Sequence, residues 1–295
     1  MTVCSTSMCT SSCLVPIQPA GDAPPFFCVH PAGGDILAYA ALARHLGLDQ
    51  PFYGLQARGL SSSEPPLESI PAMAAAYLAE IRGVQPSGPY RLGGWSLGGL
   101  IAFEMARQLR EQDEEVALLA LLDSTPRIAG GEAIDDVRLL LDIAAYVANL
   151  WGREVHLAPE DLEGLDPGEQ LDRTLEALRA ADFLPPGTGL AQLRRAVAVY
   201  RASSRAVSDY RPRPCPGGAV LFQTVEREEA GPAWNELLEG PLTIETVPGQ
   251  HLTLLSEPHV GVLAARLWTH LEAFPGCEPS TPLQGVIEEV VPSDG

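Results

Sequence analysis

The chain has 295 residues, of which 46% are hydrophobic, and its 38 acidic against 19 basic residues give a formal net charge of −19. Every basic residue is an arginine, which excludes lysine-based chemistry such as a Schiff base. The acidic balance argues against nucleic acid as a partner, because that binding depends on neutralising phosphates. No apolar run reaches the ~20 residues that cross a bilayer, and Met1–Ser5 do not start a signal peptide. We therefore expect a cytoplasmic protein without membrane contacts.

The cysteines do not form a metal-binding pattern. No C-x-x-C pair occurs, and the spacing near the N-terminus does not match a zinc site. We expect reduced thiols, no metal ion and no bound cofactor. The six cysteines are Cys4, Cys9, Cys13, Cys28, Cys215 and Cys277.

Strands and helices alternate after residues 1–15, which we expect to be a disordered leader. The predicted strands are Phe26–Val29, Pro51–Leu55, a segment near Tyr90, and Val116–Leu122. The helices predicted between them are Ile36–Leu46, Ile70–Arg82 and Leu97–Arg110. Val116–Leu122 is apolar without alternation, which is typical of a strand buried on both faces of a parallel sheet. Strands that alternate with helices of about 10–15 residues indicate right-handed βαβ units and an open parallel sheet.

The alternation stops after the last of these strands. From about Ile134 to Tyr210 the pattern is only helical, with helices predicted at Asp135–Trp151, Pro167–Asp182 and Gly189–Asp209. Three consecutive helices do not fit a simple crossover, so we expect an inserted lid at about residues 130–212. The sheet resumes at Gly218–Gln223 and Leu242–Val247, and a last helix follows at Val260–Phe274. We expect one domain over residues 16–274 and a loose acidic tail at 275–295.

Residues 94–98 read Gly-Trp-Ser-Leu-Gly and lie between a predicted strand and a predicted helix. A Gly-x-Ser-x-Gly motif matters in that setting, because the sharp turn exposes the serine at the N-terminus of the helix. The two glycines leave space where a Cβ would strike a neighbouring element. We expect Ser96 to be a nucleophile rather than part of an ordinary glycine turn.

Two further polar residues follow predicted strands, as Ser96 does. Asp123 ends the apolar strand 116–122, and His251 comes shortly after the strand 242–247. Ligand sites of open parallel sheets lie at the carboxyl ends of the strands, and the order Ser, Asp, His is that of an α/β-hydrolase. We expect Ser96 as nucleophile, His251 as general base and then acid, and Asp123 as the residue that orients the imidazole. His259 is the alternative base.

The predicted strand 26–29 runs into His30-Pro31-Ala32-Gly33-Gly34, where this architecture keeps half of its oxyanion hole. We expect the backbone N–H groups of Ala32 and Leu97 to point at one oxygen atom. We expect His30 to order the loop and to take no part in proton transfer.

Together these motifs resemble the thioesterase domains that release products from nonribosomal peptide synthetases and modular polyketide synthases. The resemblance extends from about Leu14 to His270 and rests on His30–Gly34, Gly94–Gly99, Leu121–Ser124 and Gly249–His251. It implies an α/β-hydrolase with a mostly parallel sheet, flanking helices and a helical lid. It also implies a peptidyl or polyketide chain, presented on the 4′-phosphopantetheine of a carrier protein, that is transferred to the serine. Water, or a hydroxyl or amine of the same chain, then releases it.

Three other interpretations remain open. The chain could be a general esterase or lipase for small esters, an editing thioesterase that removes aberrant acyl groups, or a non-catalytic binding protein on this fold. Separate editing members of the family more often have histidine or tyrosine before the serine, so Trp95 favours product release.

Between residues 194 and 213 the local charge reverses. Six arginines lie there beside one acidic residue, Asp209. Because carrier proteins are commonly acidic, we hypothesise that Arg194 and Arg195 contact the carrier or its phosphate. The alternative is a solvated helix face whose arginines pair with acidic residues of the protein itself.

Overall fold

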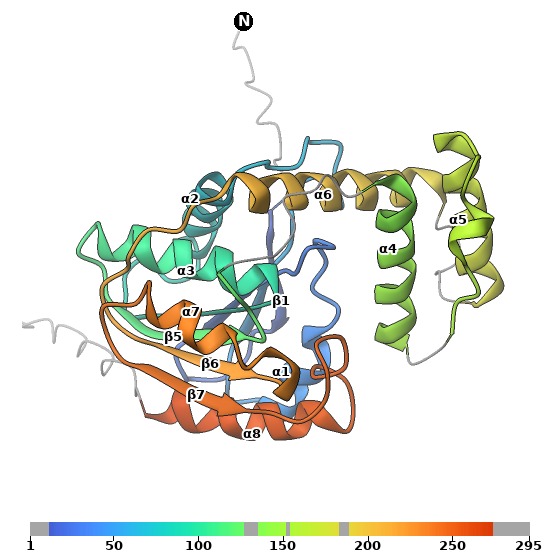
Figure 1. The fold of residues 1–295 in the computed structure, drawn as a ribbon. Coiled ribbons are helices and arrows are strands. Elements are labelled where there is room, and N and C mark those ends of the chain that lie inside the picture. The colour runs from blue at the N-terminus through green and yellow to red at the C-terminus, as the bar shows by residue number, and fades with distance from the viewer. Residues whose placement is uncertain (1–11, 127–134, 152–153, 183–188, 274–295) are drawn as a thin grey trace, which may run out of the picture.

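A twisted, mostly parallel sheet carries the site. The computed structural model describes residues 12–126, 135–151, 154–182 and 189–273 (Figure 1). The strands of this part are β1 (Leu14–Gln18), β2 (Phe26–Val29), β3 (Phe52–Leu55), β4 (Tyr90–Trp95), β5 (Val116–Leu122), β6 (Ala219–Gln223) and β7 (Leu242–Thr246). Their order in the sheet is β1-β3-β2-β4-β5-β6-β7, and only the β1–β3 pair is antiparallel.

Helices cover both faces of the sheet. One face packs against α1 (Tyr39–Leu46) and α8 (His259–Glu272), and the other against α2 (Ile70–Ile81), α3 (Leu97–Arg110) and α7 (Ala230–Asn235). The last five residues of β5 are buried, which fits the continuous apolar run of its sequence. The carboxyl ends of β4, β5 and β6 therefore meet at one edge of a rigid core.

The inserted lid consists of α4 (Asp136–Trp151), the short helix η1 (Pro159–Asp161), α5 (Pro167–Ala180) and α6 (Leu190–Asp209). It has its own buried cluster, formed by Leu139, Leu140, Ile143, Leu162, Leu175, Leu193 and Val197. In Figure 1, α4 and α5 stand beside the main body, and α6 runs back over it toward α2 and α3. The Asp166 side chain caps α5 by accepting from the N–H groups of Gly168 and Glu169.

The α/β-hydrolase class predicted from the sequence is confirmed, but three elements differ from the prediction besides the short helices η1 and η2 (Val225–Arg227), which were not predicted. Helix α1 begins at Tyr39 and not at Ile36, because Asp35 accepts a hydrogen bond from Leu37 N–H (3.0 Å) and holds a turn there. β1 was not predicted and begins before the expected domain boundary at residue 16. Its proline is compatible with an edge strand.

The short helix α7 is the third difference. Gly231 and Pro232 make its sequence a poor helix, but Trp234 packs on Phe103 with ring centroids 5.1 Å apart. Trp234 also donates to the carbonyl of Ser124 (2.8 Å). Tertiary packing therefore outweighs local propensity here. The expected leader up to residue 11 and the expected tail lie outside the described residues.

Candidate active site

Ser96 stands on a sharp turn between β4 and α3. Its backbone angles, φ 57° and ψ −120°, are rare for a residue other than glycine. A Cβ on Gly94 would lie 2.2 Å from the carbonyl carbon of Gly98, and a Cβ on Gly98 would lie 2.1 Å from the carbonyl oxygen of Val29. Only glycine at both positions lets the strand, the turn and the helix approach so closely. The turn thereby places Ser96 at the positive end of α3.

His251 and Asp123 approach Ser96 from two other loops. His251 Nε2 lies 3.1 Å from Ser96 Oγ, and His251 Nδ1 lies 2.6 Å from Asp123 Oδ2. When Nδ1 donates to the carboxylate, Nε2 is free to accept the hydroxyl proton of the serine. The three residues expected from the sequence therefore form a continuous hydrogen-bonded relay.

Asp123 is fully buried, and its neighbours favour its ionised form. Its Oδ1 accepts from Thr224 N–H (2.8 Å) and from the Thr224 hydroxyl (3.0 Å), while Oδ2 accepts from His251. Burial alone would raise the pKa of Asp123, but the hydrogen bonds from His251 and Thr224 outweigh it and lower the pKa below its usual value. A charged carboxylate at this position can orient the imidazole and stabilise its protonated form.

Arg227, which sequence reasoning missed, also reaches this network. It lies in the short helix η2 (Val225–Arg227), and its Nε is 3.3 Å from Asp123 Oδ2, the oxygen that binds His251. The preceding residue, Glu226, accepts from the Gln250 side chain (2.9 Å) next to His251. One signal was available: η2 follows β6, which pairs with β5, so its residues emerge at the edge where Asp123 lies.

The alternative base, His259, does not take part in the relay. It begins α8, and its ring lies against Gly249, where an added Cβ would come 2.9 Å from His259 Cδ2. Two further histidines contact carboxylates: His45 with Glu257 (2.7 Å) and His270 with Glu245 (3.1 Å). His156 lies exposed in the lid.

The loop after β2 and the start of α3 lie in direct contact. An added Cβ on Gly98 would be 2.8 Å from the His30 carbonyl oxygen, so the two segments touch. Ala32 belongs to this loop, and Leu97 is the first residue of α3, where an N–H has no acceptor within the helix. Within the described ranges neither amide donates a backbone hydrogen bond. Neither N–H is therefore committed to another backbone acceptor there.

His30 supports the same loop from the interior. It is fully buried, Nδ1 donates to the Pro31 carbonyl (2.7 Å), and Nε2 accepts from the Tyr77 hydroxyl (2.6 Å). Burial lowers the pKa of His30 to about 4, so the ring is neutral at pH 7. These contacts fix the loop and leave His30 with no part in the relay.

The arginines of residues 194–213 have partners within the protein. Three of them pair with its own acids: Arg201 with Asp136, Arg205 with Glu68 (2.9 Å), and Arg213 with Glu111 (3.7 Å). Arg195 donates to the carbonyl of Leu60 (3.0 Å), and Arg211 donates to the carbonyls of Ser208 and Tyr210. Arg194 is exposed, and no ion pair is found for it in the part of the chain that the structure describes. The self-paired alternative therefore accounts for most of this cluster.

The structure offers other chemistry little support. Among the described residues, no group of three or more His, Cys, Asp or Glu side chains could hold a metal ion. Cys13, Cys28 and Cys215 are buried free thiols, and burial raises the pKa of Cys13 to about 11. Cys4, Cys9 and Cys277 lie outside the described residues. In the same described ranges, no helix has the length and apolar character needed to cross a membrane.

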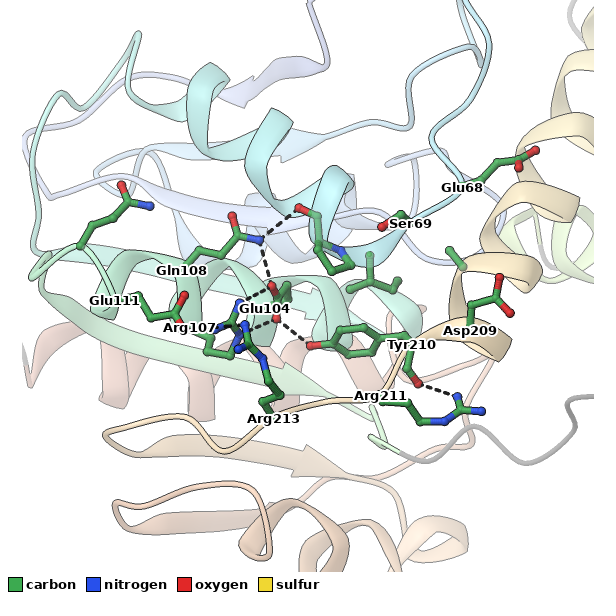
Figure 2. Close-up of a pocket in the computed structure, with 14 residues that line it drawn as sticks. Glu68, Ser69, Glu104, Arg107, Gln108, Glu111, Asp209, Tyr210, Arg211 and Arg213 are labelled. Carbon is green, nitrogen blue, oxygen red and sulfur yellow. Dashed lines mark hydrogen bonds and ion pairs between the residues drawn. The ribbon is translucent and has the colours of Figure 1, made fainter.

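A cleft of about 750 Å³ lies between α2, α3 and the end of α6, away from the relay (Figure 2). Figure 2 shows its central side chains turned toward one another: Glu104 accepts from Arg107 Nε (2.7 Å) and from the Tyr210 hydroxyl (2.8 Å). Arg107 also pairs with Glu111. The Tyr210 hydroxyl and the pair of Arg213 with Glu111 thus tie the end of α6 and the residues after it to α3. We assign no reaction to this cleft.

Comparison with known proteins places the chain in a family. The family model described as "Thioesterase domain" matches residues 24–267. The chain is 38% identical over 234 residues to a dimodular nonribosomal peptide synthase of Bacillus subtilis (strain 168), a match covering 77% of this chain and 9% of the synthase. It is 31% identical over 268 residues to chondramide synthase cmdD of Chondromyces crocatus, a match covering 87% of this chain and 7% of that synthase. The chain thus spans less than a tenth of these relatives.

Solved structures agree with these matches. A four-domain nonribosomal peptide synthetase matches with a TM-score of 0.81 and 29% identity, over 88% of this chain and 20% of that one. The Vlm2 thioesterase domain matches with a TM-score of 0.67 and 27% identity, over 87% of this chain and 97% of that domain. A further structure of the Vlm2 domain holds a dodecadepsipeptide. Because the family model covers most of its length, the chain belongs to the thioesterase domain family, which is a family of hydrolases.

Proposed function

We propose that this chain releases a peptidyl or polyketide chain from the phosphopantetheine thioester of a carrier protein, through an acyl-serine intermediate. The observation that carries the proposal is the relay from Ser96 through His251 to the buried Asp123, set at the N-terminus of α3. Its curated relatives include nonribosomal peptide synthases, and the structurally similar Vlm2 domain binds a depsipeptide. Both support an acyl chain of this class as the substrate.

In the first step, His251 Nε2 takes the hydroxyl proton of Ser96, and the serine oxygen attacks the thioester carbonyl carbon. The carbonyl oxygen becomes an oxyanion that accepts hydrogen bonds from the N–H groups of Ala32 and Leu97. Collapse of this intermediate breaks the carbon–sulfur bond. The departing sulfur receives the proton from His251, so the carrier leaves with a free thiol and the acyl group stays on Ser96.

In the second step, water or a hydroxyl or amine of the bound chain attacks the ester on Ser96. His251 removes a proton from that nucleophile and returns it to the serine oxygen. Attack by water releases a carboxylic acid, and attack by the chain's own group releases a ring. Asp123 remains ionised throughout and holds the imidazole in the required tautomer.

The carrier is the partner of this reaction. Arg194 is exposed on the lid helix α6, and we propose that it and the partly buried Arg195 contact the acidic carrier or the phosphate of its arm. Arg195 would keep its hydrogen bond to the Leu60 carbonyl in that role.

The test is incubation of the protein with a peptidyl-phosphopantetheine thioester, followed by intact mass of protein and products. We expect a transient acyl adduct on the wild type, none on Ser96→Ala, and a loss of about 10⁴-fold or more in kcat/KM for that variant. Ser124→Ala is the matched control, because Ser124 is buried near the turn and its hydroxyl lacks a hydrogen-bond partner among the described residues. An adduct on Ser96→Ala, or turnover of free esters only, would contradict the proposal.

A further inference from the structure

A cavity of about 200 Å³ adjoins the relay on the side of His251. Trp95, which precedes Ser96, lines it, and its ring centroid lies 5.3 Å from that of His251. Its other walls come from the start of α1, from α4 and from the loop after His251: Leu37, Ala38, Ala41, Tyr146, Asn149, Leu252, Leu255, Ser256 and Glu257. Only the Trp95 ring would therefore separate an occupant of this cavity from the general base, His251.

The rim of this cavity carries apolar surface. Leu37 and Leu252 expose 62% and 39% of their surface there, where apolar carbon meets water. Covering that surface is favourable, so an occupant with an apolar group fits this cavity.

The walls indicate which part of the substrate fits. Five of the ten lining residues are leucine or alanine. Two of the polar ones are already bonded, Tyr146 to Asp35 and Glu257 to His45 (2.7 Å). The cavity therefore suits an apolar group better than the phosphopantetheine arm, whose two amides need polar partners. The volume is below the ~300–1,000 Å³ of sites that enclose a drug-sized ligand, so it suits one side chain. Tyr146 comes from the lid and is fixed by its hydroxyl, which donates to Asp35 (3.0 Å).

We propose that this cavity binds an apolar side chain of the acyl group next to the thioester, with the Trp95 ring as the wall between that side chain and His251. The inference rests on the proposed function and names its substrate class: acyl chains that end in an apolar amino acid of about leucine size.

The test compares N-acetyl-leucyl and N-acetyl-alanyl thioesters of N-acetylcysteamine. We expect the wild type to prefer the leucyl substrate by about tenfold or more, since each methylene contributes ~1–3 kcal/mol. Ala41→Leu fills the cavity and should remove that preference, because it lowers kcat/KM for the leucyl substrate far more than for the alanyl substrate. Ala40→Leu is the matched control, because Ala40 is the adjacent, exposed residue of α1.

A second variant keeps the test decisive if Ala41→Leu folds poorly. Leu252→Ala removes a wall and should reduce the leucyl preference.

Equal rates for the leucyl and alanyl substrates in the wild type would overturn this inference. So would an effect of Ala41→Leu that follows the thiol and not the acyl group when pantetheine replaces N-acetylcysteamine. Labelling of Ser96 by a fluorophosphonate is measured in parallel. Labelled, active but unselective protein rejects only the cavity, whereas unlabelled and inactive protein rejects the proposed function itself.

A second, independent observation concerns η2. Arg227 Nε lies 3.3 Å from Asp123 Oδ2, and Glu226 accepts from Gln250, the neighbour of His251 (2.9 Å). Consecutive residues of one short helix thus contact Asp123 and the neighbour of His251. We infer that Arg227 is a positioning residue, which partly neutralises Asp123 and so limits how strongly the carboxylate stabilises the protonated imidazole.

The other charged or titratable groups around this pair are few. The Ser96 hydroxyl faces Nε2, Glu226 lies behind Gln250, and His259 lies against Gly249. Thr224 binds Asp123 but carries no charge. Among the described residues, Arg227 is therefore the arginine that contacts the Asp123 carboxylate.

The test is the pH dependence of kcat/KM. In Arg227→Gln, the uncompensated carboxylate stabilises the protonated imidazole more strongly, so the acid limb should move to higher pH by roughly 0.5–1 unit. Arg227→Lys should restore most of the wild-type limb. Arg266→Gln removes an equal charge from an exposed pair with Glu245 and should leave the limb in place. An unmoved limb in Arg227→Gln, or identical profiles for the Gln and Lys variants, would overturn the inference while leaving the relay intact.

Discussion

The sheet and the lid hold their polar side chains in different ways. At the carboxyl edge of the sheet, Asp123 is fully buried, and hydrogen bonds reach both of its oxygens. In the lid, ion pairs such as Arg173 with Asp161 (3.2 Å) are half-exposed, and the helices are held together by a cluster of leucines, an isoleucine and a valine.

This difference suggests different tolerance to substitution in the two regions. Ser96 and Asp123 directly follow β4 and β5, and the buried Asp123 binds His251, so these three side chains are held by fixed contacts. The lid is joined mainly by apolar packing, which tolerates volume-conserving changes. We therefore expect lid residues to accept substitution more readily than Ser96, Asp123 and His251.

The largest effect on kcat/KM is expected when a carboxylate at the edge of the sheet is replaced, in comparison with a carboxylate of the lid. Asp123→Asn should lower kcat/KM by about 10³–10⁴-fold, because the amide no longer holds the imidazole in the productive tautomer. Asp136→Asn breaks an exposed lid pair with Arg201 and should change kcat/KM by less than about twofold. Steady-state kinetics with one thioester measures both. Similar losses in the two variants would show that the lid pair also positions the reaction.

Two leucines test whether the regions unfold together. Leu119→Ala in β5 should lower the free energy of unfolding by about 2–5 kcal/mol, since this side chain is 1% exposed. Leu175 in α5 is 3% exposed, and Leu175→Ala should lower the stability of the lid by a similar free energy without destabilising the sheet. Hydrogen exchange should then speed up in α4–α6 and stay slow in β5. Equal loss of protection in both regions would mean that lid and sheet form one cooperative unit.

The pH dependence of stability should reveal His30. Its folded-state pKa of about 4 lies below the ordinary value of 6.5, so the unfolded chain takes up the proton first as pH falls. The stabilisation from the neutral ring is therefore complete above pH 6.5 and is lost between pH 6.5 and 4, by about 3 kcal/mol. Denaturant titrations of wild type and His30→Gln measure this. His30→Gln should be less stable than the wild type at pH 7, and its free energy of unfolding should fall much less between pH 6.5 and 4. Parallel plots of unfolding free energy against pH for the two proteins would contradict the prediction.

The smallest effect concerns the carrier. Arg194→Glu combined with Arg195→Glu should lower kcat/KM for carrier-bound substrate by about 3–10-fold, chiefly through slower association, and more at low salt. The same variant should turn over a free pantetheine thioester normally. Arg44→Glu combined with Arg266→Glu, which makes an equal charge change at exposed arginines of α1 and α8, serves as the control. Unchanged turnover of carrier-bound substrate in the double variant would remove the lid arginines from the interface.

The sequence predicted most of the sheet and all three members of the relay. Both depend on short-range rules: Gly94 and Gly98 permit the turn at Ser96, and residues that follow parallel strands gather at one edge. Prediction failed where distant contacts decide the outcome. The Trp234 side chain stabilises α7 through Phe103 and Ser124, and a turn at Asp35 shortens α1.

By itself, then, the sequence determined the fold class, the strained turn at Ser96 and the membership of the relay, because backbone sterics and strand polarity act between near neighbours. Only the tertiary structure decided that Arg227 touches Asp123 and that Arg201 and Arg205 pair with the protein's own acids. Only it placed Trp95 and Tyr146 around a cavity beside His251. Such partners lie far apart in the chain, and packing alone sets which side chains meet.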